Sequence, residues 1–294
     1  MAKSKVYFTK TITPEKVLEM YKVLGVELPG KVAVKLHTGE KGNQNFIRPE
    51  YMKPTVEYVK GTVVETNTGY EGVRRRTETH KELIKEHGWD IFDTEILDSE
   101  GPDTELPIKN HKKIDKHIVG KNMAKYDSML VLAHLKGHPG GGFGGALKQL
   151  SIGCASADGK AWIHSAGTNR DADKIWAHRA EQRDFCQSMG DAASAIVDYF
   201  GEGKIAFVNI MMNLSVDCDC VSEAEDPCMA DIGILSSLDP VALDQACIDL
   251  IYNSKDPGRD HMVERIESRL GIVTIETAAE NGAGSREYEL INVD

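Results

Sequence analysis

The amino-acid sequence predicts an α/β fold, with a largely parallel or mixed sheet flanked by helices. Short β-branched runs alternate with helical patterns along most of the chain, as in βα units. Met129–Ala133 is apolar throughout, which is typical of a strand covered on both faces. The 294 residues, 41% of them hydrophobic, can bury a sizeable core without disulfides.

The N-terminal part of the chain shows this alternation first. Pro49 is expected at the first position of a helix, and Gly88 should end the next one. The expected elements are, in order, a strand at Val32–Leu36, a helix at Arg48–Lys60, a strand at Thr62–Thr66, a helix at Thr79–His87 and an extended segment at Ile91–Leu97.

The segment Leu97–Lys113 is rich in Pro, Asp and Lys and has no clear period, so it predicts a loop or insertion. It is the best place for a boundary between an N-terminal α/β lobe at 1–110 and a C-terminal α/β lobe at 111–294. One continuous domain is the alternative, because the chain length allows both.

The C-terminal part continues the alternation. Asp239 before Pro240 is a typical helix cap, while Asp231 and Asp244 are expected to be solvated or capping carboxylates. The expected elements are a strand at Met129–Ala133, a helix at Asp171–Phe200, a strand at Ile205–Ile210, helices at Pro240–Tyr252 and Pro257–Leu270, a strand at Ile272–Glu276 and an extended segment at Glu287–Val293.

Charge and hydropathy bear on the partners and the compartment. The net charge of -11 argues against nucleic acid or an anionic membrane as the main partner, and Arg74–Arg76 is interpreted as a solvated loop. Met1–Lys10 lacks the apolar core of a secretory signal, and the apolar run Ile205–Met212 is too short to span a membrane. A cytoplasmic protein with reduced thiols is therefore expected.

Most of the chemically interesting residues follow the ends of apolar strands, where ligands bind in open α/β sheets. Lys35 and His37 end the first strand and lead into a loop of glycines and amides. They offer a cation for binding an anionic substrate and an imidazole for acid or base catalysis. A polar turn before a helix is the alternative interpretation.

A glycine-rich loop follows the strand at Met129–Ala133. Gly141, Gly142, Gly144 and Gly145 precede an expected helix, so their amides are predicted to bind an anion at its N-terminus. Lys148 lies about one turn into that helix and is a candidate catalytic residue. The loop matches neither the Walker A nor the dinucleotide-binding pattern, and a flexible surface turn is the alternative.

Histidines accompany the glycine-rich loop. His134 is a candidate catalytic residue, although a structural role at the end of a buried strand is equally compatible with the pattern. His138 and His164 are expected to bind substrate in the same pocket.

The strongest local signal is a cysteine cluster, C-x-C-x7-C, formed by Cys218, Cys220 and Cys228. Thiols at i and i+2 leave the same face of an extended segment, so Cys218 and Cys220 are predicted to bind one metal with Cys228. Asp217 and Asp219 should raise the thiol pKa values, which favours a bound cation.

The identity of the metal stays open. An iron-sulfur cluster and zinc are the cofactors considered, and three cysteines fall short of the usual four ligands. A histidine, Cys154 or the substrate would complete the set. Small buried cysteines in a loop are the alternative, and core packing is the expected role of Cys186 and Cys247.

Taken together, these segments resemble a widespread prokaryotic family, domain-of-unknown-function family 362, whose members are often described as containing an iron-sulfur centre. The resemblance implies an α/β fold with cluster or metal ligands at Cys218, Cys220 and Cys228. Some members also carry a ferredoxin module, whose cysteine spacing this sequence lacks. The matching segments are Val34–Glu40, Arg48–Glu50, Thr66–Tyr70, Gly144–Lys148, Gly153–Ala155, Cys218–Cys220, Asp231–Leu235, Asp239–Asp244 and Gly284–Leu290.

Three functions follow from these patterns. The first is a metal-binding protein in redox or electron transfer, for which a redox partner protein is expected. The second is a non-redox enzyme, zinc-assisted or using general acid and base, that acts on a small anionic substrate. The third is a binding or scaffold protein whose glycines and thiols are structural.

Overall fold

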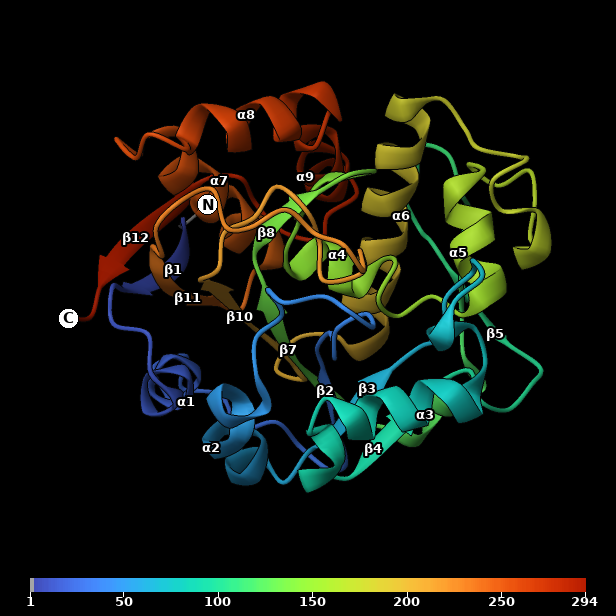
Figure 1. Cartoon of the computed structure of the whole chain (residues 1–294), viewed down its shortest axis with the longest axis horizontal. Coiled ribbons are helices and arrows are strands. Elements are labelled where there is room, and N and C mark those ends of the chain that lie inside the picture. The colour runs from blue at the N-terminus through green and yellow to red at the C-terminus, as the bar shows by residue number, and fades with distance from the viewer. Residues whose placement is uncertain (1–2) are drawn as a thin grey trace.

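A mixed eight-stranded sheet runs through the whole molecule (Figure 1). The computed structural model describes residues 3–294, so the first two residues of Met1–Lys10 lie outside it. The strand order is β12-β1-β11-β10-β7-β2-β3-β4. The strands are β1 (Ser4–Thr9), β2 (Val32–Lys35), β3 (Thr62–Glu65), β4 (Thr94–Ile96), β7 (Ser128–His134), β10 (Ile205–Met211), β11 (Gly233–Ser237) and β12 (Tyr288–Asn292).

Most neighbouring strands of this sheet are parallel. The run β10-β7-β2-β3-β4 is parallel throughout, and β12 is parallel to β1, whereas β11 is antiparallel to both of its neighbours. The predicted mixed α/β fold is therefore confirmed. Two small antiparallel sheets are formed by β5 (Thr104–Pro107) with β6 (Lys116–Val119) and by β8 (Lys136–His138) with β9 (Gly142–Gly144).

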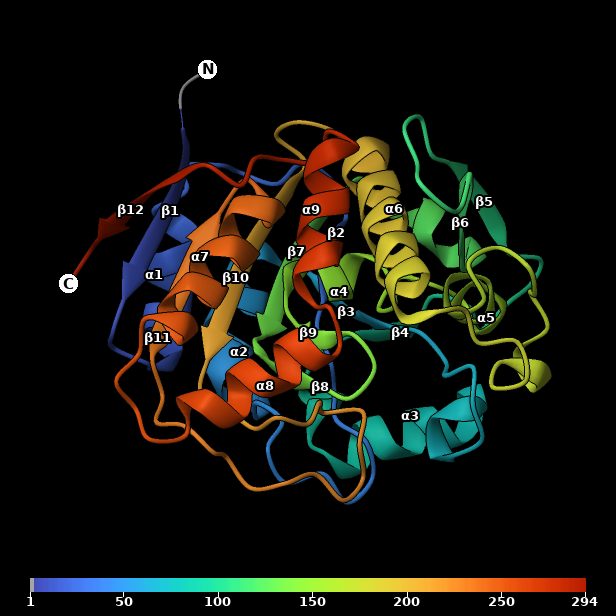
Figure 2. The same ribbon diagram turned by 90° about the horizontal axis from the view of Figure 1, so that it is seen from above.

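Helices cover both faces of the sheet. In Figure 1, α1, α2 and α3 lie below it and α4, α6, α7, α8 and α9 above it, while α5 lies to one side next to β5 and β6 (Figures 1 and 2). None of the helices in residues 3–294 is long and apolar enough to cross a membrane. The helices are α1 (Pro14–Lys22), α2 (Pro49–Val59), α3 (Thr77–Glu86), α4 (Ala146–Leu150), α5 (Ala157–His164), α6 (Gln182–Phe200), α7 (Pro240–Tyr252), α8 (Arg259–Ser268) and α9 (Ile272–Glu280), with short 3-10 turns η1 (Val73–Arg75), η2 (Trp89–Ile91), η3 (Lys121–Lys125) and η4 (Ala172–Lys174).

The buried strand β7 separates two hydrophobic cores. Met129 and Val131 pack into the core under α4, α6, α7 and α9, while Leu130 and Leu132 pack into the opposite core under α1 and α2. Alternate side chains of a strand point to opposite faces, so a strand between two cores must be apolar at every position. This is why the sequence alone predicted a buried strand here.

Two predicted elements differ from the structure. Ile272–Glu276 was predicted as a strand from its β-branched residues, but it forms the first half of α9, whose buried face packs on α6. Tertiary packing overrides a weak local propensity here. The predicted helix at Asp171–Phe200 begins only at Gln182, because residues 171–181 form η4 and turns.

The main sheet takes strands from both 1–110 and 111–294. The predicted boundary segment Leu97–Lys113 contains β5, which pairs with β6 across the same boundary. Asp239 caps α7 as predicted, because its Oδ1 accepts from the backbone N–H groups of Val241 and Ala242, both at 2.9 Å.

Candidate metal site and pocket

Parallel strands β2, β3, β7 and β10 end at the same edge of the sheet, and the loops that follow them meet there. The segment after β10 carries Cys218 and Cys220, the segment after β7 carries Lys136 and His138, and His37 follows β2. The topology thus brings together side chains that are widely separated in the sequence.

Cys218, Cys220 and His138 form a compact group. One potential ligand atom from each lies within 4.8 Å of the others, and His138 Nε2 is 3.7 Å from Cys220 Sγ. The two thiols are held together by a turn rather than an extended segment, since the N–H of Val221 donates to the carbonyl of Cys218 at 2.9 Å. These three side chains could hold a metal ion.

The other two cysteines proposed as ligands lie outside this group. Cys228 Sγ donates to the carbonyl of Leu214 at 3.3 Å, and burial raises the pKa of its thiol. Cys154 is fully buried beyond β3, and burial raises its pKa to about 12. Among the described residues, neither belongs to the Cys218, Cys220 and His138 group. The structure thus brings Cys218 and Cys220 together and places Cys228 and Cys154 apart from them, so the role of these two as metal ligands stays a prediction.

Lys148 supplies a cation beside the thiols. Its Nζ lies 3.2 Å from Cys218 Sγ. Burial raises the pKa of Cys218, but the hydrogen bond from Cys220 and the charges of Lys148 and Lys136 outweigh it, so this pKa lies well below its ordinary value. The pKa of Cys220 is raised well above its ordinary value by that same hydrogen bond and by burial. Lys148 and Lys136 thus favour ionisation of the Cys218 thiol over that of Cys220.

The two aspartates next to the cysteines have partners other than the thiols. Asp219 is buried and accepts from Lys136 Nζ at 2.7 Å, while His134 Nδ1 lies 2.9 Å from its other oxygen. Asp217 accepts from Arg265 at 2.8 Å. Asp219 raises the pKa of Cys218 as expected, but lysine, histidine and arginine side chains of the chain itself lie against both carboxylates.

His134 belongs to this buried network through both of its ring nitrogens. Its Nε2 lies 2.6 Å from the carbonyl of Met212 and its Nδ1 faces the Asp219 carboxylate. Both ring nitrogens therefore face an acceptor oxygen. His134 is not among the residues that line the pocket described below, so its predicted catalytic role stays a prediction, and its contacts hold the turn that carries Asp219.

The glycine-rich loop is a tight hairpin of β8 and β9 rather than an open anion cradle. The N–H groups of Ala146 and Leu147, at the start of α4, both donate to the buried Asp244 carboxylate at 2.9 Å. A Cβ on Gly145 would lie 2.5 Å from Asp244 Oδ1. An internal carboxylate therefore occupies the place where an anionic ligand was predicted, and the burial of Asp244 raises its pKa to about 6.

The other loop glycines have packing roles. Gly142 has a φ of +82°, and its Cβ would meet the backbone of Gly271 at 2.9 Å. The N–H groups of Gly140 and Gly141 both donate to His138 Nδ1, at 3.0 and 2.7 Å. Since Nδ1 must accept, the neutral ring carries its proton on Nε2, which points at Cys220. Gly144 lies against the side chains of Lys136 and Lys148.

A second network follows β2 and β3. Lys35 Nζ pairs with Glu65 at 2.7 Å, and both are buried, so Lys35 is not free to bind an anion. Arg74 donates to Glu40 at 2.9 Å and to Tyr70 Oη at 3.2 Å, and its Nη1 lies 3.1 Å from His37 Nε2. Burial and the charge of Arg74 hold the pKa of His37 well below its ordinary value. His37 is therefore a neutral imidazole.

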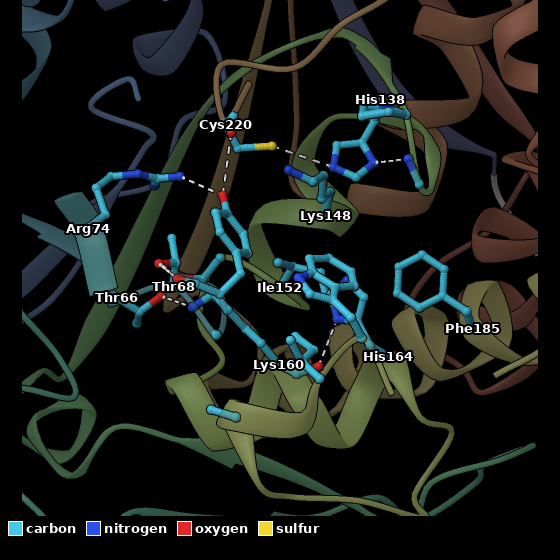
Figure 3. A pocket seen from close by; sticks show the side chains of 18 of the residues that line it. Thr66, Thr68, Arg74, His138, Lys148, Ile152, Lys160, His164, Phe185 and Cys220 are labelled. Carbon is cyan, nitrogen blue, oxygen red and sulfur yellow. Dashed lines mark hydrogen bonds between the residues drawn. The ribbon is translucent and has the colours of Figure 1, made fainter. Parts of the chain in front are cut away.

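A cavity of about 540 Å³ opens beside these groups (Figure 3). Of the predicted site residues, His37, His138, Lys148, His164 and Cys220 line it. His164 stacks on Phe185 with ring centroids 4.6 Å apart, and burial lowers its pKa to about 4.

Sequence patterns alone did not single out several residues of the cavity. Arg74 was expected in a solvated loop but is 3% exposed, because its partners Glu40 and His37 come from a distant segment. Tyr70 lies in Thr66–Tyr70, one of the segments that resemble the family, and this resemblance was the only feature of the sequence that pointed to it. Trp176 and Phe185 belong to a segment predicted as one helix, and nothing local marked them as pocket residues.

The fold and this group of side chains define a mixed α/β protein with a Cys/His group, suited to a metal ion, at the wall of a pocket. The chain belongs to the DUF362 family, a domain of unknown function, whose family model matches residues 32–249. The resemblance noted in the sequence is thereby confirmed. No curated protein matches the chain.

Solved structures show distant similarity. The lactate racemase apoprotein from Thermoanaerobacterium thermosaccharolyticum matches 71% of this chain at 12% identity and a TM-score of 0.45. A Thermotoga maritima protein solved by a structural genomics consortium matches 93% of it at 13% identity and a TM-score of 0.42. The chain spans 51% and 60% of the lengths of these two proteins.

Proposed function

We propose that this protein is a zinc-assisted, non-redox enzyme acting on a small anionic substrate. The observation that carries the proposal is the Cys218, Cys220 and His138 group, whose ligand atoms lie within 4.8 Å of one another at the wall of the 540 Å³ cavity. Two thiolates and one imidazole are a known ligand set of catalytic zinc, which keeps its fourth position for water or substrate.

The donor spacing supports a single ion. Tetrahedral zinc with ordinary bond lengths sets sulfur and nitrogen ligands about 3.6 Å apart and two sulfurs about 3.8 Å apart. Cys220 Sγ and His138 Nε2 are 3.7 Å apart. Iron-sulfur clusters usually use four cysteines, and the described residues bring two together here. The site therefore favours zinc over a cluster, and non-redox chemistry over electron transfer.

Metal binding is coupled to the glycine turn. His138 Nε2 carries the ring proton because Gly140 and Gly141 donate to Nδ1. Zinc at Nε2 takes the place of this proton, so either the ring binds as an imidazolate held by the two amides or Nδ1 gains the proton and the amides turn away. Both cases change the environment of these two N–H groups.

The remaining pocket groups bind and orient the substrate. Two thiolates neutralise a zinc ion, which leaves the ammonium of Lys148 to bind an anionic group. His164 is a neutral imidazole whose Nδ1 faces the carbonyl of Lys160 at 2.7 Å, so its Nε2 can accept a proton at the pocket wall. His37 lines the same wall, but N–H groups of Gly39 and Arg74 face its two ring nitrogens. When bound, zinc acts as a Lewis acid that polarises a substrate oxygen or activates water.

A zinc competition titration on protein purified without oxygen tests the proposal. The wild type is expected to be colourless and to bind one zinc per chain. Cys220→Ser and His138→Ala should weaken binding by more than roughly 100-fold, since outer-shell partners alone contribute about 10 to 100-fold. Cys228→Ser and Cys154→Ser are the matched controls and should leave affinity unchanged. A brown, iron-containing protein, or equal affinities in all five proteins, contradicts the proposal.

A further inference from the structure

The cavity has two chemically different sides. Cys220, His138 and Lys148 lie on one side, and in Figure 3 the Lys148 side chain points toward the other two. Aromatic rings gather on the other side, where His164 and Phe185 lie next to each other. A ligand that fills the cavity must therefore suit a polar end and an aromatic end.

The aromatic side has an uncovered ring. The centroid of Trp176 lies 5.6 Å from that of His164, edge-on, and 6.0 Å from that of Tyr70, in a stacked orientation. Trp176 nevertheless remains 55% exposed, although it lines the cavity. An exposed indole at the wall of a cavity offers a flat face on which a planar ligand ring can stack.

The charges on the cavity wall favour a ligand with one negative charge. Arg74 pairs with Glu40 and Arg75 with Asp173. Lys160 donates to three oxygens, each at 2.7 Å, so all its protons are used. Arg179 also lines the cavity, but it is exposed to solvent and lies 5.8 Å from the Trp176 ring centroid, next to the aromatic side. Lys148 is left as the cation at the inner, thiol-bearing end of the cavity, and one ammonium there balances the charge of one carboxylate.

We infer that the substrate is an aromatic monocarboxylate, whose ring stacks on Trp176 with its edge toward His164 and whose carboxylate binds Lys148. The carboxylate part rests on the proposed function, because zinc must neutralise the thiolates before Lys148 can serve a ligand. The ring part rests on the aromatic wall alone. A cavity of 540 Å³ is within the usual range for small-molecule sites and holds a bicyclic ring with a short acidic side chain.

Calorimetric titration of the full chain with three probes tests this inference. The probes are 2-naphthylacetate, cyclohexylacetate, which has the charge without an aromatic ring, and 2-naphthylmethanol, which has the ring without the charge. With zinc bound, naphthylacetate should bind about fivefold tighter than cyclohexylacetate. It should bind at least about tenfold tighter than naphthylmethanol.

Variants assign these preferences to residues. Trp176→Ala should weaken naphthylacetate binding about tenfold, whereas Trp176→Phe, which keeps a ring, should weaken it less than about threefold. Lys148→Met should remove the preference for naphthylacetate over naphthylmethanol. Tyr199→Ala is the matched control, since Tyr199 is also an exposed aromatic residue but packs edge-on against Phe200 and does not line the cavity.

The inference and the proposed function can fail separately. In zinc-free protein the carboxylate preference should fall below about threefold while the ring preference remains. If no zinc binds but the ring preference depends on Trp176, the ring part stands and the proposed function fails. Equal affinities for naphthylacetate and cyclohexylacetate, or no binding at millimolar concentrations to zinc-loaded protein, overturn the inference.

Discussion

The buried carboxylate of Asp219, which belongs to the turn that carries Cys218 and Cys220, lies 2.7 Å from Lys136 Nζ. Lys136 and Asp219 are 2% and 1% exposed at their side chains, and His134 contacts the second carboxylate oxygen. This ion pair joins the segment after β7 to the segment after β10. It therefore fixes the position of the two thiols relative to His138.

Replacing Asp219 by Asn should destabilise the fold by about 3 to 5 kcal/mol, because it leaves Lys136 and His134 buried without their counter-charge. Urea unfolding measures the loss. Glu19→Gln, which breaks the exposed pair with Lys16, is the matched control and should cost less than about 1 kcal/mol. A similar small loss for both variants would show that the Asp219 pair does not hold the turn.

Gly137→Ala should damage both the fold and the metal site. A Cβ at Gly137 would lie 2.2 Å from the carbonyl oxygen of Val216, and the Gly137 N–H donates to Ser215 at 2.8 Å. The segment leading to Cys218 must therefore move, at a cost of about 1 to 3 kcal/mol and with weaker zinc binding. Gly101→Ala is the control, because nothing lies within 4 Å of its Cβ position. Equal stabilities for the two variants would refute the close contact.

Stability should fall as the pH is lowered from about 6.5 to 4, partly because of His117. This side chain is fully buried, and burial lowers its pKa to about 4. The unfolded chain takes up the proton at a higher pH than the fold does. The fold therefore loses up to about 3 kcal/mol through this residue across that range.

His117→Gln isolates this contribution. Gln can still donate to the carbonyl of Leu150, which lies 3.2 Å from His117 Nε2, but it does not titrate. The free energy of unfolding of the variant should vary less with pH than that of the wild type between pH 6.5 and 4. Parallel pH profiles for the two proteins would mean that other groups cause the acid sensitivity.

Zinc binding should shift the amide signals of Gly140 and Gly141 in a nitrogen-proton correlation spectrum. Both N–H groups donate to His138 Nδ1, whose hydrogen bonding must respond when Nε2 binds the ion. Gly201, which ends α6, is an internal reference and should not shift. Unchanged signals for Gly140 and Gly141 at saturating zinc would exclude His138 as a ligand.

The sequence was most informative where one local pattern determined the structure. The buried strand β7 was predicted because both of its faces are covered, which requires apolar residues throughout. The capping role of Asp239 was predicted because a cap and the proline after it act within one helical turn. The proximity of Cys218 and Cys220 also followed from their spacing, although a turn brings them together.

Long-range relationships could not be read in this way. Asp244, which lies in α7, caps α4, and Arg74 pairs with Glu40 across the site. In both cases the two partners are far apart in the sequence. Ile272–Glu280 is helical because its buried face packs on α6. Cys154 and Cys228 were grouped with the other thiols by chemistry, which does not specify where the chain places them.

X-ray absorption spectroscopy at the zinc edge of the loaded protein tests the central claim most directly. The account predicts two sulfur ligands at about 2.3 Å, one histidine nitrogen at about 2.0 to 2.1 Å, and one light atom completing the tetrahedron. The sulfur count should fall to one in Cys220→Ser and stay at two in Cys228→Ser. A shell of three or four sulfurs in the wild type, or no sulfur at all, would contradict the assignment of Cys218, Cys220 and His138.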